Sequence, residues 1–248
     1  MNLVIMAAGR GSRFLHRGIY TPKPMVKFLG KPLFWWATQS ALTGAPFASL
    51  HFAVLREHVI SHAIDKAILA CYPSANIKVI DSLTNGAASS AAQVVQSFKN
   101  INSPVAFVDC DLAFSFLKFQ PLFPSLIKNC AANLCVFESE NPAYSYIKFD
   151  GSGNITGTVE KKVVSRYAIA GLYFFSSIRC FLDSYNSYCS QSHYPELYMS
   201  GVFNEILARG GLVETIPLLT HVSLGTPEEL LIAENNTNNL PAWFSYEA

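Results

Sequence analysis

Short apolar runs alternate with helix-like segments along the first part of this chain. Four runs have the length of buried strands: Leu3–Met6, Leu50–Leu55, Ile77–Ile80 and Val105–Val108. Three segments between them favour helices: Pro32–Leu42, His58–Ala70 and Ala87–Phe98. This order of strands and helices is typical of a parallel sheet that is covered on both faces.

The pattern changes in the second part of the chain, where strand-like segments come first and helices follow. The predicted strands are Asn133–Glu138, Tyr146–Asp150, Ile155–Glu160 and Ile169–Phe175, and the predicted helices are Ile178–Tyr185 and Tyr198–Ala208. A last helix is expected to begin at Thr226-Pro227-Glu228-Glu229, which has the form of a capping box. Because no linker or repeat divides the chain, we expect one domain over residues 1–248, with a nucleotide-binding half at about 1–112 and an acceptor-binding half at about 113–248.

Composition narrows the classes of protein further. Half of the residues are hydrophobic and 14% are charged, which indicates a large core or an apolar subunit interface, so a homodimer is possible. No apolar run is long enough for a membrane span, and the six scattered cysteines indicate a reducing, cytoplasmic compartment. The sequence pI of about 7.6, with no basic stripe on a helix, argues against nucleic acid as a partner.

A cluster of basic residues marks the N-terminal segment. No Asp or Glu precedes Glu57, while seven basic residues occur up to that point: Arg10, Arg13, Arg17, Lys23, Lys27, Lys31 and Arg56. Such a cluster is either a solvated face or a binding site for a polyanion. Here it is interleaved with Gly and Pro in a loop after a buried strand, and this context favours the polyanion.

A glycine loop, Ala7-Ala8-Gly9-Arg10-Gly11, follows the first apolar run. Its glycines permit a tight turn and a close approach of backbone amides to phosphate oxygens. The loop lacks the third glycine of a dinucleotide fingerprint and the Gly-Lys-Ser/Thr of a P-loop, and no helical pattern starts after it. Further along, Pro22 and Pro24 frame Lys23 rigidly, which is an expensive arrangement for a lysine that only faces solvent.

More motifs follow in order: Gly30–Leu33, Leu83–Ser90, Asp109–Asp111, Val159–Lys161, Ala170–Phe174 and Leu224–Leu230. With the glycine loop and Pro22–Met25, they resemble the sugar-phosphate nucleotidylyltransferases, or sugar-nucleotide pyrophosphorylases, across Leu3–Leu230. The resemblance implies a three-layer Rossmann-like (glycosyltransferase-A-like) α/β fold with a central mixed, mostly parallel sheet. It also implies transfer of NMP from an NTP to a phosphorylated small molecule, with release of pyrophosphate.

The same resemblance implies roles for individual residues. Arg13 would clamp the triphosphate and the leaving pyrophosphate, and Lys23 would neutralise the attacking phosphate and the α-phosphate. Residues implied to bind the nucleotide are Ala7, Ala8, Gly9, Gly11, Asn85, Gly86 and Ala87. Residues implied to bind the acceptor are Tyr144, Ser145, Glu160, Lys161, Gly171 and Glu196, with Tyr198 and Asn204 near the acceptor end.

Asp111 is the predicted ligand of Mg²⁺, because carboxylates at the C-terminal ends of strands lie where open α/β sheets bind ligands. A helix cap or a turn residue is the alternative reading of this position. Asp109 lies two residues before Asp111, on the same face of the extended chain, and could share the ion. The resembled family often carries a second metal-binding Asp where this chain has Ser223, which predicts a weaker metal site, charge from Asp109 or the substrate, or a silent enzyme. His221 nearby is expected to be structural.

Three functions remain open at this stage. The first is a nucleotidylyltransferase that prefers a pyrimidine NTP (CTP, UTP or dTTP) and makes precursors for cell-surface polysaccharide, including capsule. Its acceptor is a sugar phosphate or, because Tyr144-Ser145 stands where Tyr-Gly is common, a non-sugar phosphate such as phosphocholine or a phosphorylated amino-acid derivative. The second is a nucleotide-binding regulatory subunit without turnover. A glycosyltransferase of the same fold is the third, and Lys23 argues against it, because a donor-sugar enzyme needs no lysine for an attacking phosphate.

Overall fold

A computed structural model describes residues 1–116 and 130–246 of the chain. The described residues from Asn2 onward form two compact units. We call residues 2–83, 108–116 and 219–246 the N-terminal unit, and residues 84–107 and 130–218 the central unit. The strands β6 (Val105–Asp109) and β12 (Val213–Ser223) each contribute residues to both units.

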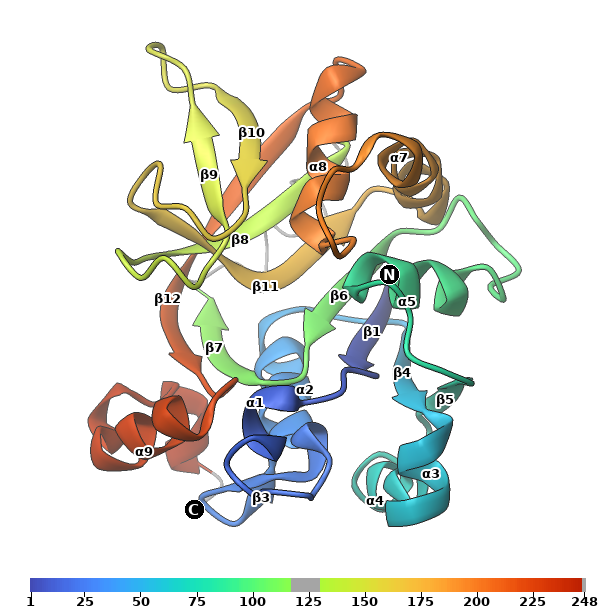
Figure 1. Cartoon of the computed structure of the whole chain (residues 1–248), viewed down its shortest axis with the longest axis vertical. Coiled ribbons are helices and arrows are strands. Elements are labelled where there is room, and N and C mark those ends of the chain that lie inside the picture. Colours follow the sequence, from blue (N-terminus) through green and yellow to red (C-terminus); the bar gives the residue numbers. More distant parts are fainter. Residues whose placement is uncertain (117–129, 247–248) are drawn as a thin grey trace. The chain divides into compact units, whose positions relative to one another are not determined.

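The N-terminal unit is built on three parallel strands (Figure 1). β1 (Asn2–Ala7) pairs in parallel with β4 (Ser49–Leu55), and β4 pairs in parallel with β5 (Asn76–Ile80). β1 is an almost continuous apolar run whose residues are buried after the first, as a parallel strand covered on both faces requires. The strand predictions for this part of the chain are therefore confirmed.

The helices of this unit are α1 (Ser12–Leu15), η1 (Lys23–Met25), α2 (Leu33–Gly44), α3 (Arg56–His62), α4 (Ile64–Cys71), α9 (Pro227–Asn235), η2 (Thr237–Asn239) and η3 (Ala242–Tyr246). A short antiparallel pair, β2 (Lys27–Phe28) and β3 (Lys31–Pro32), leads into α2. α2 packs against β7 (Leu112–Phe116), where the buried Ser40 Oγ accepts a hydrogen bond from the Phe114 amide at 2.9 Å. This bond joins the middle of the helix to a strand 74 residues away in sequence.

Two predictions for this unit were wrong in detail, and one strand was missed. The segment His58–Ala70 is two helices, because Ala63 adopts φ 49° and reorients the chain so that Ile64 and Ile68 are both fully buried. One helical turn, α1, does begin after the glycine loop. β7 was not predicted, because only two residues, neither of them Gly or Pro, separate it from β6.

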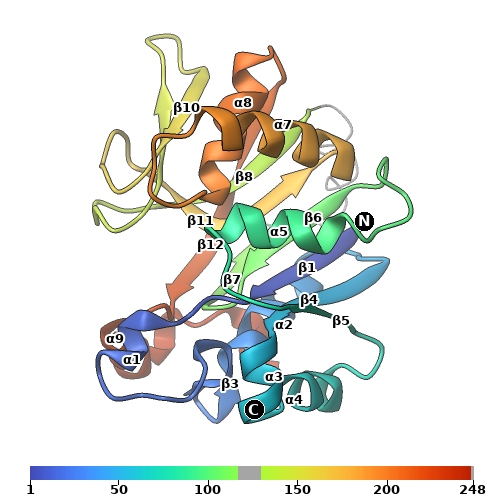
Figure 2. The same cartoon turned by 45° about the vertical axis from the view of Figure 1, so that its right-hand side comes forward.

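The central unit holds β8 (Ala132–Glu138), β9 (Tyr146–Phe149), β10 (Ile155–Val159) and β11 (Tyr167–Phe175). β8 is antiparallel to β11 and parallel to β12, and β9 forms the predicted antiparallel hairpin with β10. Its helices are α5 (Ala87–Val95), α7 (Ile178–Gln191) and α8 (Met199–Ala208), which pack on one another, as both views show (Figures 1 and 2). The helix predicted over Ala87–Phe98 thus ends earlier, at Val95.

The sequence pattern also did not predict β12. Its run contains Pro217, which pairs with Val136 of β8, and a proline inside a run argues against a strand. Its burial is irregular: Val213, Ile216 and Leu218 are buried, Pro217 and Leu219 are exposed, and the other residues are intermediate. The strand forms because a long-range parallel partner, β8, is available.

Within residues 1–116 and 130–246, every helix is too short or too polar to cross a membrane.

Gly201 provides a test of the packing between α7 and α8. A Cβ at this position would overlap the ring of Tyr188, which is itself buried. Gly→Ala in an open helical position stabilises by about 1 kcal/mol, but overpacking costs about 1–3 kcal/mol. We therefore expect Gly201→Ala to lower the free energy of unfolding in urea. Gly151→Ala, at a position with open space, is the control and should change it little. An equal loss in a Tyr188→Leu background would show that the ring is not the cause.

Candidate functional site

The glycine loop after β1 brings its backbone against Lys23. Gly11 adopts φ 67°, a conformation that residues with a side chain rarely take, and a Cβ there would lie 2.9 Å from the Cβ of Lys23. Gly9 is exposed and has open space where a Cβ would lie, whereas Ala7 and Ala8 are buried. The glycine at position 11 is therefore required both by the turn and by the position of Lys23.

Lys23 and Asp111 form an ion pair in the N-terminal unit. Lys23 Nζ donates a hydrogen bond to Asp111 Oδ2 at 2.8 Å, and both side chains are about one-fifth exposed, at 21% and 20%. Lys23 is the first residue of η1, with Pro22 before it and Pro24 after it, so its backbone has little freedom. The two residues that the sequence singled out from separate motifs thus contact each other directly.

The charges of this pair stabilise one another. Burial disfavours the carboxylate of Asp111, but Lys23, together with a backbone hydrogen bond and Arg13, lowers the pKa of Asp111 below its ordinary value. Burial also disfavours the ammonium of Lys23, but the surrounding acidic groups, Asp111 foremost, together raise the pKa of Lys23. Arg13, which is exposed on α1, adds a smaller favourable interaction with Asp111. Both members of the pair are therefore charged at neutral pH.

Cys110, between the two predicted metal-binding carboxylates, is not available as a thiolate. Burial raises the pKa of its thiol to about 12, so it stays protonated at neutral pH. Asp109 is close enough to influence the pKa of Lys23, although less strongly than Asp111 does. Among the described residues, no three His, Cys, Asp or Glu side chains gather to hold a metal ion by themselves.

The segment before α9 is fixed beside Asp111. The Leu224 amide donates to the Asp111 carbonyl at 2.8 Å. A Cβ at Gly225 would lie 2.5 Å from Asp111 Oδ2 and 3.3 Å from Glu229 Oε2. Glycine at position 225 therefore lets the backbone pass close to Asp111, where a Cβ would collide with the carboxylate.

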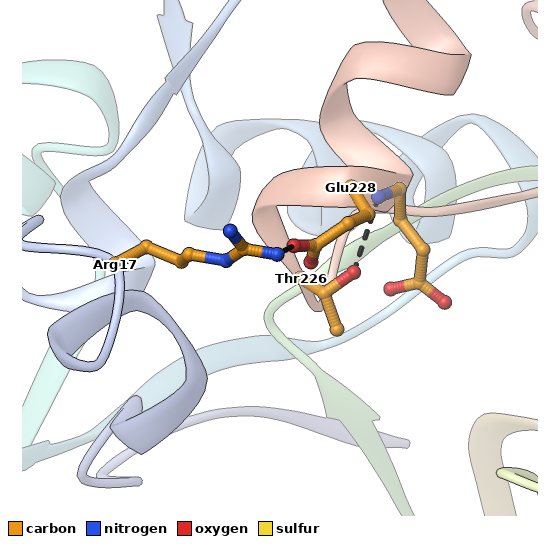
Figure 3. A network of polar contacts seen from close by, with 4 residues as sticks. Arg17, Thr226 and Glu228 are labelled. Atoms are coloured by element: carbon orange, nitrogen blue, oxygen red, sulfur yellow. Dashed lines mark hydrogen bonds and ion pairs between the residues drawn. The ribbon is translucent and has the colours of Figure 1, made fainter.

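The first turn of α9 is held from two sides, as Figure 3 shows. Thr226 caps the helix, because its Oγ1 accepts a hydrogen bond from the Glu229 amide at 3.1 Å, and Pro227 takes the first helical position. The predicted start of this helix is thus confirmed. Glu228 forms an ion pair with Arg17, which lies in the basic segment after the glycine loop.

In the central unit, the loop that precedes α5 is bonded to the chain at Leu197. The Leu197 amide donates to the Asn85 carbonyl at 2.8 Å, and the Ala88 amide donates to the Leu197 carbonyl at 3.0 Å. A Cβ at Gly86 would lie 2.6 Å from the Leu197 carbonyl oxygen, and Gly86 has φ 109°. The glycine that the resemblance assigned to nucleotide binding is thus also required for this contact.

Glu160 is held by two serines. Ser145 Oγ donates to Glu160 Oε1 at 2.6 Å, and Ser200 Oγ donates to the same oxygen. Ser145, which stands where the resembled family commonly has glycine, therefore has a hydrogen-bond partner in Glu160. These bonds orient the carboxylate before any ligand binds.

Lys161 is the next residue, and its backbone is strained. It adopts φ 51°, where its amide donates to the Tyr144 carbonyl at 3.1 Å. Lys161 Nζ donates to Tyr198 Oη at 3.1 Å and lies 5.2 Å from the centroid of the Tyr198 ring. The hydrogen bond to Tyr198 raises the pKa of Lys161, and Glu196 contributes in the same direction.

Two further predicted residues have roles in the fold. Gly171 adopts φ 71° where the pairing of β11 with β8 shifts register, which is the conformation of a bulge. Asn204 bonds the backbone of Thr158: its Oδ1 accepts from the Thr158 amide at 2.7 Å, and its Nδ2 donates to the Thr158 carbonyl at 3.2 Å. It therefore attaches α8 to β10.

The predicted residues thus fall into two groups. Those in the N-terminal unit are Ala7, Ala8, Gly9, Gly11, Arg13, Lys23, Asp109 and Asp111, and those in the central unit are Asn85, Gly86, Ala87, Tyr144, Ser145, Glu160, Lys161, Gly171 and Glu196. Sequence reasoning missed the contacts of Leu197, Ser200 and Arg17. No local signal marks them, because each contacts a residue that is distant in sequence.

The family to which the chain belongs follows from its sequence. The sequence model of the nucleotidyl transferase family matches residues 2–239, which is nearly the whole chain. The chain belongs to this family. It is therefore a nucleotidyltransferase, and the family resemblance drawn from the motifs is confirmed.

Solved structures show the fold of this nucleotidyltransferase. It is similar to the nucleoside-diphosphate-sugar pyrophosphorylase from Vibrio cholerae RC9, with a TM-score of 0.77 and 22% identity over 95% of this chain and 100% of that one. A putative glucose-1-phosphate thymidylyltransferase from Bacillus anthracis has a TM-score of 0.78 and 17% identity, with 97% of this chain and 96% of that one covered.

The inositol-1-phosphate CTP transferase from T. maritima is also similar, with a TM-score of 0.69 and 15% identity over 95% of this chain and 96% of that one. No curated protein matches the sequence of the nucleotidyltransferase. The predicted Rossmann-like α/β fold with a mixed, mostly parallel sheet is confirmed by these structures.

Lys23→Met tests the ion pair, because methionine keeps most of the apolar stem and removes the charge. We expect the free energy of unfolding at neutral pH to fall by about 1.5–3 kcal/mol, the range for charged hydrogen bonds. Because the pKa of Asp111 is lowered, the ion pair contributes its full stability above pH 3.8, the ordinary pKa of an aspartate. Because the pKa of Lys23 is raised, this contribution remains full up to pH 10.5, the ordinary pKa of a lysine.

The difference between wild type and variant should therefore shrink as the pH falls through the lowered pKa of Asp111, and again as it rises through the raised pKa of Lys23. Urea unfolding of both proteins across this pH range measures it. A difference that does not change with pH would assign the loss to packing instead of charge.

Proposed function

We propose that this nucleotidyltransferase transfers NMP from a pyrimidine NTP to a sugar phosphate, or a similar small phosphate monoester, and releases pyrophosphate. The observation that carries the proposal is the contact of Lys23 with Asp111 beside Gly11. It brings together an ammonium, a carboxylate and the amides of a glycine loop. These are groups that bind phosphates and a divalent cation.

The chemistry that the proposal requires is mostly electrostatic. A phosphate oxygen of the acceptor attacks the α-phosphorus, and the bond to pyrophosphate breaks. Both reactants are anions, so the protein must neutralise charge and hold the groups in line. In the proposal, Lys23 neutralises the acceptor phosphate and the α-phosphate, and Arg13 holds the leaving pyrophosphate. A phosphate dianion is already a nucleophile at neutral pH, so no general base is needed.

Mg²⁺ is the proposed cofactor, with Asp111 as its main ligand and Asp109 as a second. The donor set fits, because Mg²⁺ is commonly held by one or two carboxylates together with substrate phosphates. When bound, the cation would neutralise charge on the triphosphate. Asp111 would hold the cation through a carboxylate oxygen, and Lys23 would bind phosphate.

The acceptor is proposed to bind to the polar cluster of the central unit. Glu160, oriented by its two serines, suits sugar hydroxyls, and Lys161 suits the anionic end of the acceptor. Tyr144, Ser145, Gly171 and Glu196 complete this proposed set, and Asn85, Gly86 and Ala87 are proposed to bind the base and ribose. Within one domain, residues of about 1–112 would bind the nucleotide and residues of about 113–248 the acceptor.

The biological setting belongs to the same proposal. The similar structures from Vibrio cholerae and Bacillus anthracis are a nucleoside-diphosphate-sugar pyrophosphorylase and a putative thymidylyltransferase, which supports a pyrimidine NTP and a sugar phosphate. We propose a cytoplasmic enzyme, able to form a homodimer, that supplies precursors for cell-surface polysaccharide. The inositol-1-phosphate CTP transferase from T. maritima supports a non-sugar acceptor as the second candidate.

Pyrophosphate release tests the reaction directly. The protein is incubated with Mg²⁺ and each of CTP, UTP, dTTP, ATP and GTP, against hexose 1-phosphates, inositol 1-phosphate, phosphocholine and phosphorylated amino-acid derivatives. Strong release with one pair would identify both substrates. Silence across the panel, with NTP binding still detected by calorimetry, would contradict the proposal and favour a regulatory nucleotide-binding subunit.

Lys23→Ala is expected to lower kcat/KM by at least ~10²-fold, because it removes a charge that stabilises the transition state. Lys27→Ala is the matched control, since Lys27 is exposed on the same segment. The measurement is steady-state pyrophosphate release with the best substrate pair. Equal effects of the two variants would assign the loss to general electrostatics of the basic segment.

Asp111→Asn is expected to abolish the Mg²⁺-dependent activity, because the amide is a poor substitute for a carboxylate ligand. The circular dichroism spectrum should stay that of the wild type. Activity is followed against Mg²⁺ concentration, with Asp65→Asn, a change in α4, as the control. If Asp111→Asn keeps a normal Mg²⁺ dependence, the cation is bound elsewhere, and Asp109 is the next residue to change.

A further inference from the structure

The first turn of α8 contacts both of the proposed acceptor-binding residues that follow β10. Ser200 Oγ donates a hydrogen bond to Glu160 Oε1. Tyr198 Oη accepts one from Lys161 Nζ at 3.1 Å. Tyr198 is the N-cap residue of α8, and Ser200 lies only two positions further along, in its first turn. One short segment, which we call the α8 turn (residues 197–200), therefore contacts both members of the Glu160–Lys161 pair.

The backbone of Leu197 anchors the α8 turn. The Leu197 amide bonds the Asn85 carbonyl, and the Leu197 carbonyl accepts the Ala88 amide. A Cβ at Gly86 would collide with the same carbonyl, so the two backbones lie in close contact. These partners precede Leu197 by more than a hundred residues, and the anchor is therefore a feature of the tertiary fold of the central unit. The side chains of the α8 turn thus extend from a fixed backbone.

A second set of bonds attaches α8 to β10, directly beside Glu160 (Figure 1). Thr158 Oγ1 donates to the Ser200 carbonyl at 2.8 Å, and the Thr158 amide donates to Asn204 Oδ1 at 2.7 Å. Ser200 is 1% exposed, so its hydroxyl is withdrawn from water and needs an acceptor within the protein. Glu160 provides it. Ser200 therefore bonds β10 through its carbonyl and the residue after β10 through its hydroxyl.

Ser145 holds the same carboxylate oxygen from the other strand of the hairpin. Tyr146 of β9 pairs with Val159 of β10, and Ser145 and Glu160 are the next residues along these two strands. Ser145 Oγ donates to Glu160 Oε1 at 2.6 Å. The orientation of the carboxylate thus depends on one hydroxyl from the hairpin and one from α8.

Tyr198 restricts Lys161 in a comparable way. Besides their hydrogen bond, Lys161 Nζ lies 5.2 Å from the centroid of the Tyr198 ring. Tyr194 packs edge-on against that ring, with the two centroids 5.7 Å apart. A lysine side chain loses much rotamer freedom when it is fixed, so a ligand binds more tightly where a neighbour has already restricted it. The hydroxyl of Tyr198 therefore prepares Lys161 for an anionic group.

We propose that Ser200 and Tyr198 are positioning residues of the acceptor site, which act through Glu160 and Lys161 and thereby set how tightly the acceptor binds. This inference rests on the proposed function, which assigns the acceptor to Glu160 and Lys161, and it adds the element that holds them in place. The alternative is a purely structural role, in which the Glu160 carboxylate stabilises the N-terminus of α8. Only positioning makes the affinity for the acceptor depend on the two hydroxyl groups.

Steady-state pyrophosphate release tests the inference, with the substrate pair that the panel of NTPs and acceptors identifies. We expect Ser200→Ala to raise the KM for the acceptor by at least about fivefold, and Tyr198→Phe by at least about threefold, because each removes a hydrogen bond to a charged group. The KM for the NTP and kcat should stay within about twofold, as for a loss of ground-state binding. Two matched controls remove a hydroxyl elsewhere and should leave the acceptor KM within about twofold. They are Ser184→Ala, at a buried position of α7, and Tyr194→Phe, in the neighbouring ring.

Double variants distinguish positioning from structural support. In a Glu160→Ala background, Ser200→Ala should change the acceptor KM by less than about twofold, because the residue through which it acts is gone. Lys161→Met should remove the effect of Tyr198→Phe for the same reason. Fully additive effects in these backgrounds would assign a structural role and overturn the inference. Equal rises in the KM for the NTP and the KM for the acceptor would overturn it as well.

The outcomes also separate the inference from the proposed function. If the enzyme turns over and the acceptor KM is unchanged in Ser200→Ala and Tyr198→Phe, the inference is overturned and the proposed function stands. If no substrate pair releases pyrophosphate, the proposed function fails and the inference fails with it. Thermal unfolding of each variant confirms that it is folded.

Discussion

The ion pair between Lys23 and Asp111 is the interaction on which the candidate site depends. It joins residues 88 positions apart, and it forms only because Gly11 leaves room for the side chain of Lys23. Both partners are largely withdrawn from water, so each charge is tolerated because the other is present. Their opposite charges keep both groups ionised at neutral pH. In the function proposed above, phosphate would bind to Lys23 and a divalent cation to Asp111.

The central unit prepares its polar groups differently, by hydrogen bonds within a strained turn. Two serines orient Glu160, and the left-handed backbone of Lys161 directs its ammonium to Tyr198. Conformations of this kind cost on the order of 1–3 kcal/mol, and they persist where the surroundings hold them. Here the bond from the Lys161 amide to the Tyr144 carbonyl helps to hold the turn. Preorganised side chains are what a small polar acceptor requires, because few of its groups can be left unpaired when it binds.

Local patterns predicted much of the fold and some of the site. The apolar run of β1 and the hairpin of β9 and β10 were predicted because burial and turn chemistry leave direct traces in the sequence. The cap at Thr226 was predicted for the same reason. β12 was not predicted, because a proline lies within it and some of its side chains are exposed. It forms because it pairs with β8. The break at Ala63 in the predicted helix was not predicted either, because it depends on the burial of Ile64 and Ile68 in the core.

The sequence by itself determined the class of fold, the glycine loop, the lysine framed by prolines and the acids at the end of β6, because each depends on neighbouring residues. Only the tertiary structure decided which of these groups meet. The bond of Lys23 to Asp111, the need for glycine at positions 11, 86 and 225, and the bond of Ser200 to Glu160 all depend on contacts between distant segments. The physical reason is that a side chain's charge and shape are local properties. Its partner, its burial and therefore its pKa are set by the packing of the whole unit around it.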